Sequence, residues 1–167
     1  MAKPPVFPMK TANGVEVNYF QLLCSMVKPY LQEDGISLNF EGYIETISEY
    51  TSLTEEQIDK AWKLTKELNT WSEYFSDIAN LIQKLYLDSE TDKIEKQATA
   101  SILCDATKVA NGDRLSNKDP EVIKSRKKRN VLKAFYDELV AKIEFLNRAH
   151  YHCKATYELS KKNTLNP

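Results

Sequence analysis

A long stretch of this chain lacks the two residues that most readily interrupt helices. Neither glycine nor proline occurs between Thr54 and Ala110, and both residues are unfavourable in helix interiors. Apolar side chains in this stretch recur at spacings of three and four residues, which places them on one face of a helix. They are Trp62, Leu64, Leu68, Trp71, Phe75, Ile78, Ile82 and Leu85. The sequence therefore predicts long helix here, with a break near Asn69-Thr70 or within residues 88–92, where polar residues gather.

A second long helix is predicted in the C-terminal third of the chain. From residue 132 onward, mostly apolar residues alternate steps of four and three, which is the spacing of a coiled-coil seam. They are Leu132, Tyr136, Leu139, Ile143, Leu146, His150, Cys153 and Tyr157. In the first helix, the apolar stripe resumes among small neighbours at Ile94, Ala98, Ile102 and Val109. We expect these small neighbours to let another helix approach closely.

The two helices are predicted to be joined by a short connection. Asn111-Gly112 predicts the end of the first helix, because glycine readily adopts the left-handed cap conformation. Asp119-Pro120 predicts the start of the second helix, since aspartate caps helices and proline suits their first turn. A short connection makes long helices antiparallel and places Ala98 near Lys133. The predicted fold class is all-α, with a long antiparallel, coiled-coil-like helical hairpin and a small N-terminal helical subdomain.

Two regions are expected along the chain. Residues 1–52 are predicted to form an N-terminal arm and a small acidic helical subdomain. Within it, one helix is expected over residues 17–32, ended or kinked by Pro29, and a shorter one over about residues 40–50. Residues 53–167 are predicted to form the hairpin with a basic turn region.

The chain lacks the residues that several classes of protein function require. The three cysteines, Cys24, Cys104 and Cys153, are widely spaced, which predicts reduced thiols in the cytoplasm rather than disulfides or a zinc site. His150 and Cys153 share a helix face but supply too few ligands for a closed metal site. No apolar run approaches the roughly 20 residues of a membrane span, and no glycine-rich phosphate loop occurs. We therefore predict no catalytic residue, no cofactor, no metal and no membrane partner, and a protein that is not an enzyme.

Charge is divided unevenly along the chain. Residues 1–95 carry 8 basic and 16 acidic side chains, whereas residues 96–167 carry 15 basic and 8 acidic ones. The densest basic group lies near the predicted turn, and cations at a helix N-terminus oppose the helix dipole. Helix stability therefore gives no reason for them, although a solvated helix end is the simpler interpretation. We predict that eight residues bind phosphates: Arg114, Lys118, Lys124, Arg126, Lys127, Lys128, Arg129 and Lys133.

The hairpin region also resembles a known family. The similarity covers about residues 70–160 and consists of two long helices, a charged turn and a second helix that ends in an Ala-His-Tyr segment. This pattern resembles the UvsY-like recombination mediators of phages. The residues that carry the resemblance are 119–123, Arg126, 130–134, 142–146 and 149–154. The resemblance implies weak binding of single-stranded DNA, oligomerisation through helices, and loading of a recombinase onto strands covered by single-strand-binding protein.

Two functions remain open from the sequence. The first is a phage-type accessory protein, acting in the host-cell cytoplasm as a homo-oligomer, that binds single-stranded DNA through the eight basic residues. No aromatic residue occurs between Tyr86 and Phe135, so we expect contacts with phosphates rather than base stacking. An acidic protein partner would fit the same cations equally well. The alternative is a protein-binding inhibitor or adaptor, such as a phage product that blocks a host enzyme, using its acidic half or its helix faces.

Overall fold

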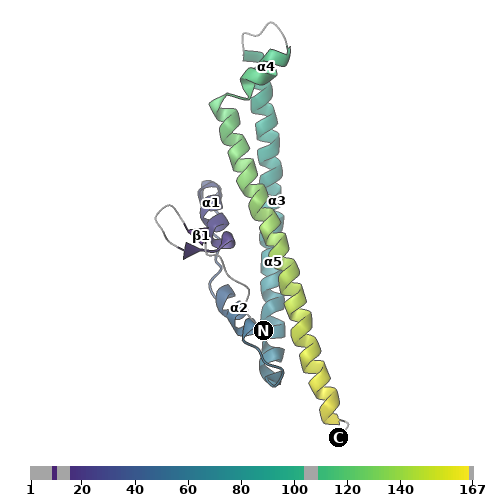
Figure 1. Cartoon of the computed structure of the whole chain (residues 1–167). Coiled ribbons are helices and arrows are strands. Elements are labelled where there is room, and N and C mark those ends of the chain that lie inside the picture. The colour runs from purple at the N-terminus through teal and green to yellow at the C-terminus, as the bar shows by residue number, and fades with distance from the viewer. Residues whose placement is uncertain (1–8, 11–15, 104–108, 166–167) are drawn as a thin grey trace. The chain divides into compact units, whose positions relative to one another are not determined.

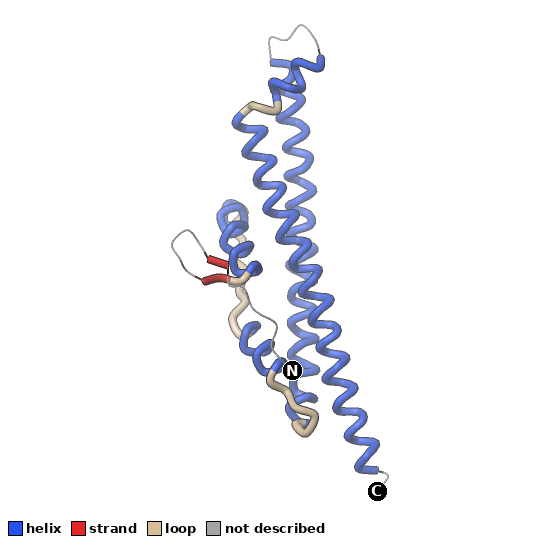
Figure 2. The backbone as a smooth tube through the Cα atoms, in the orientation of Figure 1, coloured by secondary structure: helices blue, strands red, loops and turns tan. Residues whose placement is uncertain are grey.

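The chain folds as an all-α helical hairpin with small N-terminal helices, as predicted. The computed structural model describes residues 9–10, 16–103 and 109–165. Two long helices run antiparallel, and the other described elements are short helices and a two-residue antiparallel strand pair (Figures 1 and 2). In chain order the elements are β1 (Met9–Lys10), β2 (Glu16–Val17), α1 (Tyr19–Glu33), α2 (Tyr43–Thr51), α3 (Ile58–Leu103), α4 (Val109–Ser116) and α5 (Pro120–Leu165).

The chain divides into two compact units, and each long helix contributes to both. The first unit comprises residues 1–37 and 82–135, and the second comprises residues 38–81 and 136–167. The predicted boundary after residue 52 stays a prediction. None of the described helices is both long enough and apolar enough to cross a membrane.

Helix α3 continues through both places where a break was expected. The predicted break near Asn69-Thr70 or within residues 88–92 is therefore wrong. The amide of Asn69 donates to the Glu73 carboxylate at 2.9 Å, and the Thr70 hydroxyl donates to the Lys66 carbonyl at 3.1 Å. Polar side chains bonded within one helix turn satisfy one another without interrupting the backbone ladder.

The predicted helix end at Asn111-Gly112 is also wrong. Helix α3 ends at Leu103, and Gly112 lies inside α4 without a positive φ. A Cβ atom at Gly112 would lie 2.9 Å from the Ser101 hydroxyl oxygen and 3.3 Å from the Ser101 carbonyl oxygen. Glycine is needed here because α4 approaches the last turns of α3 closely, and not because it caps a helix.

Helix α5 begins where the sequence predicts. The Asp119 carboxylate accepts the backbone N–H groups of Glu121 at 2.8 Å and Val122 at 3.2 Å, and Pro120 is the first helical residue. Donors that would otherwise lack a helical partner are thereby satisfied. This cap fixes the start of α5, so the basic residues that follow lie in its first turns.

The pairing between α3 and α5 differs from the prediction in its register. The Lys133 ammonium lies 6.0 Å from the centre of the Tyr86 ring, not near Ala98, and Arg129 contacts Glu90. The shift arises because α3 ends earlier than predicted, and α4 accounts for part of the chain between the long helices. When the first of two antiparallel helices ends earlier than expected, each of its residues pairs with a different residue of the second helix.

The register shift exposes the apolar stripe at the end of α3. Ile94 and Ile102 expose 55% and 83% of their surface, and Ala98 is exposed as well. The expectation that another helix packs on these apolar side chains is therefore wrong for Ile94, Ala98 and Ile102, and the side chain of Val109 lies outside the described residues. Helix α4 does approach α3 closely, but at the small residue Ser101. Ser89, on a different face of α3 from these residues, is buried. The buried surface of α3 in the first unit is therefore partly polar.

Each unit has its own apolar core. In the first unit, Phe20 of α1 stacks on Phe135 of α5 with ring centres 6.2 Å apart. Burial confirms the predicted seam of α5 at alternate members, which are completely buried, whereas the members between them are only partly buried. The completely buried members are Leu132 in the first unit and Leu139, Leu146 and Cys153 in the second.

Candidate nucleic-acid interface

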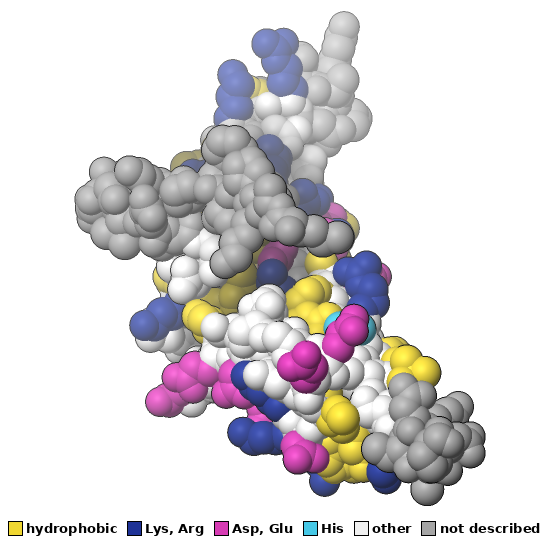
Figure 3. Space-filling view, turned by 60° about the horizontal axis from the view of Figure 1, so that its bottom comes forward, with side chains coloured by type: hydrophobic (Ala, Val, Ile, Leu, Met, Phe, Trp, Pro, Cys, Tyr) yellow, Lys and Arg dark blue, Asp and Glu magenta, His cyan; other side chains and the backbone are white. Residues whose placement is uncertain are grey.

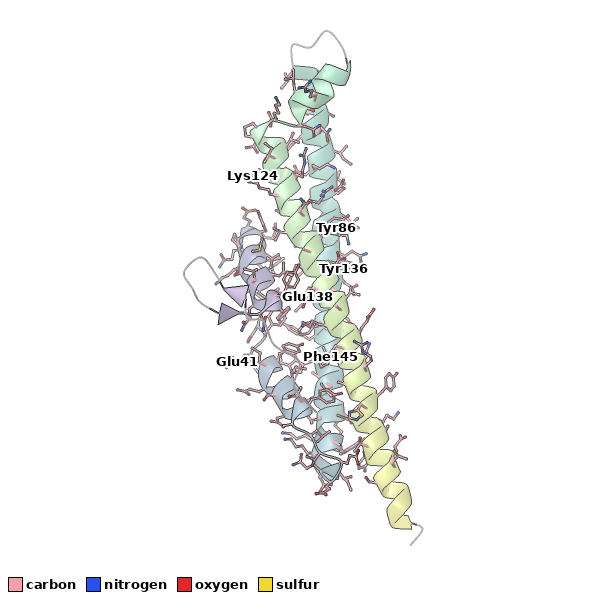
Figure 4. The ribbon with its side chains drawn as sticks, in the orientation of Figure 1. Glu41, Tyr86, Lys124, Tyr136, Glu138 and Phe145 are labelled. Atoms are coloured by element: carbon pink, nitrogen blue, oxygen red, sulfur yellow. The ribbon has the colours of Figure 1, made fainter. Side chains whose placement is uncertain are left out.

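The eight predicted phosphate-binding residues all lie in the first unit. Arg114 is on α4, Lys118 is in the connection that follows it, and the other six lie on the first half of α5. Lys124 extends outward from this part of α5 (Figure 4). The residues come together because they are close in sequence and the connection between α4 and α5 is short.

Five of these cations are exposed, and one of the five, Lys133, makes further contacts within the chain. Within the described part of the chain, none of the other four forms an ion pair with a carboxylate. They are Arg114, Lys118, Lys124 and Lys127. Exposed cations without a carboxylate partner retain their full charge for an anionic ligand.

Two of the predicted cations are already engaged within the unit. The Lys128 ammonium lies 3.5 Å from the Glu33 carboxylate and 5.8 Å from the centre of the Tyr30 ring. The Arg129 guanidinium lies 2.8 Å from the Glu90 carboxylate. These contacts reduce the charge that either side chain offers to a ligand.

The remaining two cations make other contacts. The Arg126 guanidinium donates to the side-chain oxygen of Asn117 at 2.5 Å, which orients it without neutralising it. Lys133 lies by Tyr86 and has further interactions within the chain. The structure thus divides the predicted set: four exposed cations form no ion pair within the described residues, Arg126 is oriented by Asn117, and Lys128, Arg129 and the exposed Lys133 contact neighbouring side chains.

Charged groups also join α3 to α5 in this unit. Hydrogen bonds from Lys93 and then Arg129 hold the pKa of Glu90 below its ordinary value. The Ser125 hydroxyl donates to the Asp92 carboxylate at 2.6 Å, and this bond is the largest cause of the lowered Asp92 pKa. The helix pairing beside the basic residues therefore depends partly on two ionised carboxylates.

Acid is expected to weaken this pairing. Because the folded-state pKa values of Glu90 and Asp92 are lowered, their stabilisation is present above the ordinary pKa values and is lost as the pH falls through the lower folded ones. Urea unfolding at about pH 6 and about pH 3 measures this loss. The double variant Glu90→Gln/Asp92→Asn should depend less on pH, and an equal dependence in both proteins would contradict the assignment.

A second surface feature was not predicted from the sequence. Trp71 belongs to the apolar stripe of α3, yet its side chain is only half-buried and borders two hollows in the second unit. The available signal was the four-residue spacing of Glu41, Glu45 and Glu49, which places acids on one side of a short helix. Among the described residues, no group of three or more histidine, cysteine, aspartate or glutamate residues could hold a metal ion.

No protein-family model matches the chain, and comparison with curated proteins and with solved structures found no match. The fold and its surfaces define a helical-hairpin protein with exposed cations in one unit and an acid-lined aromatic surface in the other.

Proposed function

We propose that this protein is a non-enzymatic accessory protein that binds single-stranded DNA through the exposed cations beside the α4–α5 connection. The supporting observation is that Arg114, Lys118, Lys124 and Lys127 are exposed and form no ion pair within the described residues. Each phosphate neutralised by such a cation releases condensed counterions, which favours binding at low salt. The lack of aromatic residues over 87–134 favours phosphate contacts over base stacking.

The proposed biological role rests on the resemblance to phage recombination mediators. In this role the protein would help to load a recombinase onto DNA covered by single-strand-binding protein, in the cytoplasm of the host cell. Both proteins would then be partners of this chain.

The proposal includes self-association. Leu87 and Ile94 each expose 55% of their surface on α3, and with the exposed Ala98 and Ile102 they form an apolar stripe at helical spacing. A second copy would cover this stripe, because an uncovered row of large apolar side chains is unusual on a monomer. Light scattering on the purified chain measures the number of subunits.

Reversing two of the exposed cations tests DNA binding. The double variant Lys124→Glu/Lys127→Glu should bind labelled oligo(dT) about tenfold more weakly at low salt, since attraction to phosphate becomes repulsion. Its log–log salt slope should be shallower by about 0.7 for each phosphate that the variant no longer neutralises. Fluorescence anisotropy at several salt concentrations measures both quantities, with duplex DNA and RNA as comparisons.

A matched control separates a local site from net charge. Arg148→Glu/Lys154→Glu makes the same charge change at two exposed residues of α5 in the second unit. This control should retain most of the affinity for oligo(dT). Equal weakening in both double variants, or unchanged affinity in the first one, would reject the proposed interface.

A further inference from the structure

Two hollows meet at Trp71 in the second unit. The first, of about 490 Å³, lies between α2 and α3 and is lined by Glu45, Glu49 and Trp71 among others. The second, of about 330 Å³, is lined by Glu41, Trp71 and Tyr74 among others. We call the two hollows together the Trp71 groove. It is large enough for more than one side chain of a ligand, since typical ligand sites span about 300–1,000 Å³.

The indole at the middle of the groove is held in place. Its Nε1 donates to the Thr46 hydroxyl at 3.2 Å, and its ring meets Tyr43 and Tyr74 edge to face with centres 5.5 and 5.7 Å apart. A Cβ atom at Gly42, whose φ is +82°, would lie 3.7 Å from the indole. The half-buried Trp71 ring is therefore a preorganised aromatic surface that a ligand can reach.

The groove carries net negative charge, because its lining has four glutamates and two lysines. Of its two lysines, Lys63 pairs with Glu67 at 3.3 Å, and Lys66 lies 5.2 Å from the centre of the Trp62 ring. Glu41 and Glu45 are exposed and Glu49 is half-buried. Within the described part of the chain these three glutamates form no ion pair.

Glu41 projects outward beside the start of α2 (Figure 4). The face turned forward in Figure 3 carries acidic, basic and hydrophobic side chains close together. An aromatic surface bordered by acids suits a cation and repels a phosphate.

We propose that the Trp71 groove binds a basic peptide segment of a partner protein, with an arginine side chain over the Trp71 indole and neighbouring cations paired with Glu41, Glu45 and Glu49. Arginine fits better than lysine because its planar guanidinium stacks on an aromatic face and pairs with carboxylates at the same time. This inference does not depend on DNA binding, because the groove lies in the other compact unit.

Binding of a labelled tetra-arginine peptide to the full chain tests the groove. Fluorescence anisotropy at low and moderate salt should show binding of this peptide, weaker binding of tetra-lysine and none of tetra-glutamate. The double variant Glu45→Gln/Glu49→Gln keeps the side-chain shapes and should weaken tetra-arginine binding about tenfold. Trp71→Leu should reduce the preference for arginine over lysine.

The control makes the same charge change outside the groove. Glu55→Gln/Glu56→Gln removes two exposed acids of the same unit and should leave tetra-arginine binding within about twofold. An equal loss in both double variants, or no tetra-arginine binding at low salt, would overturn the proposal. Self-association that disappears in Glu45→Gln/Glu49→Gln would also overturn it, because the occupant would then be a second copy. Oligo(dT) affinity should be the same in the groove variant as in the unchanged protein.

Discussion

Replacing Leu139 with arginine should lower the free energy of unfolding by more than about 5 kcal/mol. Leu139 is completely buried on the α5 seam. The substitution removes about 2–3 kcal/mol of leucine burial and adds about 3–5 kcal/mol for a buried charge without a partner. Because typical domains are stable by only about 5–15 kcal/mol, much of the variant should be unfolded at room temperature. Urea unfolding followed by far-ultraviolet circular dichroism measures the change.

A neighbouring residue provides the control for this substitution. Ala141 lies two residues further along α5 and is exposed. Ala141→Arg should change the free energy of unfolding by less than about 0.5 kcal/mol. Leucine and arginine have similar helix propensities, so the difference between the variants reports burial. If Leu139→Arg unfolded at the same urea concentration as Ala141→Arg, the seam would not be part of the core.

The two long helices were predictable because their signals are local. Heptad spacing in α5 and the capping residues Asp119-Pro120 act within a few turns, and both predictions are confirmed. The absence of glycine and proline correctly predicted a long α3. Polar residues such as Asn69 misled the prediction of a break, because their side chains are satisfied within the helix itself.

The register could not be read from the same signals. It depends on where α3 ends, and Asn111-Gly112 suggested an end after Ala110 although the helix ends at Leu103. The close approach between Gly112 and Ser101 is a tertiary contact that no local pattern reveals. One wrong helix end therefore moved Ile94 from an expected interface to the exposed surface.

For the candidate sites too, local features could be predicted from the sequence and tertiary contacts could not. The basic residues could be placed together because they are neighbours in sequence. The pairing of Lys128 with Glu33 and of Arg129 with Glu90 could not be predicted, since both partners are distant along the chain. The Trp71 groove was hidden because a tryptophan at core spacing in α3 gives the same pattern whether its ring is buried or half-buried.

Replacing Phe75 with alanine should lower the free energy of unfolding by about 3–5 kcal/mol. Phe75 is completely buried, and its ring centre lies 4.8 Å from that of Tyr43 and 5.3 Å from that of Phe40. Burial first, and the Glu138 carboxylate second, raise the pKa of Tyr43 to about 12, which agrees with a dry environment on this side of the cluster. Loss of the phenyl ring would leave a cavity between α3 and α2. Urea unfolding measures the loss of stability.

The effect should reach the Trp71 groove, because α2 carries Glu45 and Glu49 and packs on Phe75 through Tyr43. Amide hydrogen exchange over residues 43–51 should accelerate in Phe75→Ala, and tetra-arginine binding should weaken in proportion. Phe75→Leu provides the control, since a large apolar side chain fills much of the space and should cost less than about 1.5 kcal/mol. If Phe75→Ala destabilised the chain while exchange in α2 stayed unchanged, α2 would be held by other contacts. The position of α2 beside Trp71 would then not depend on the packing of Tyr43 against Phe75.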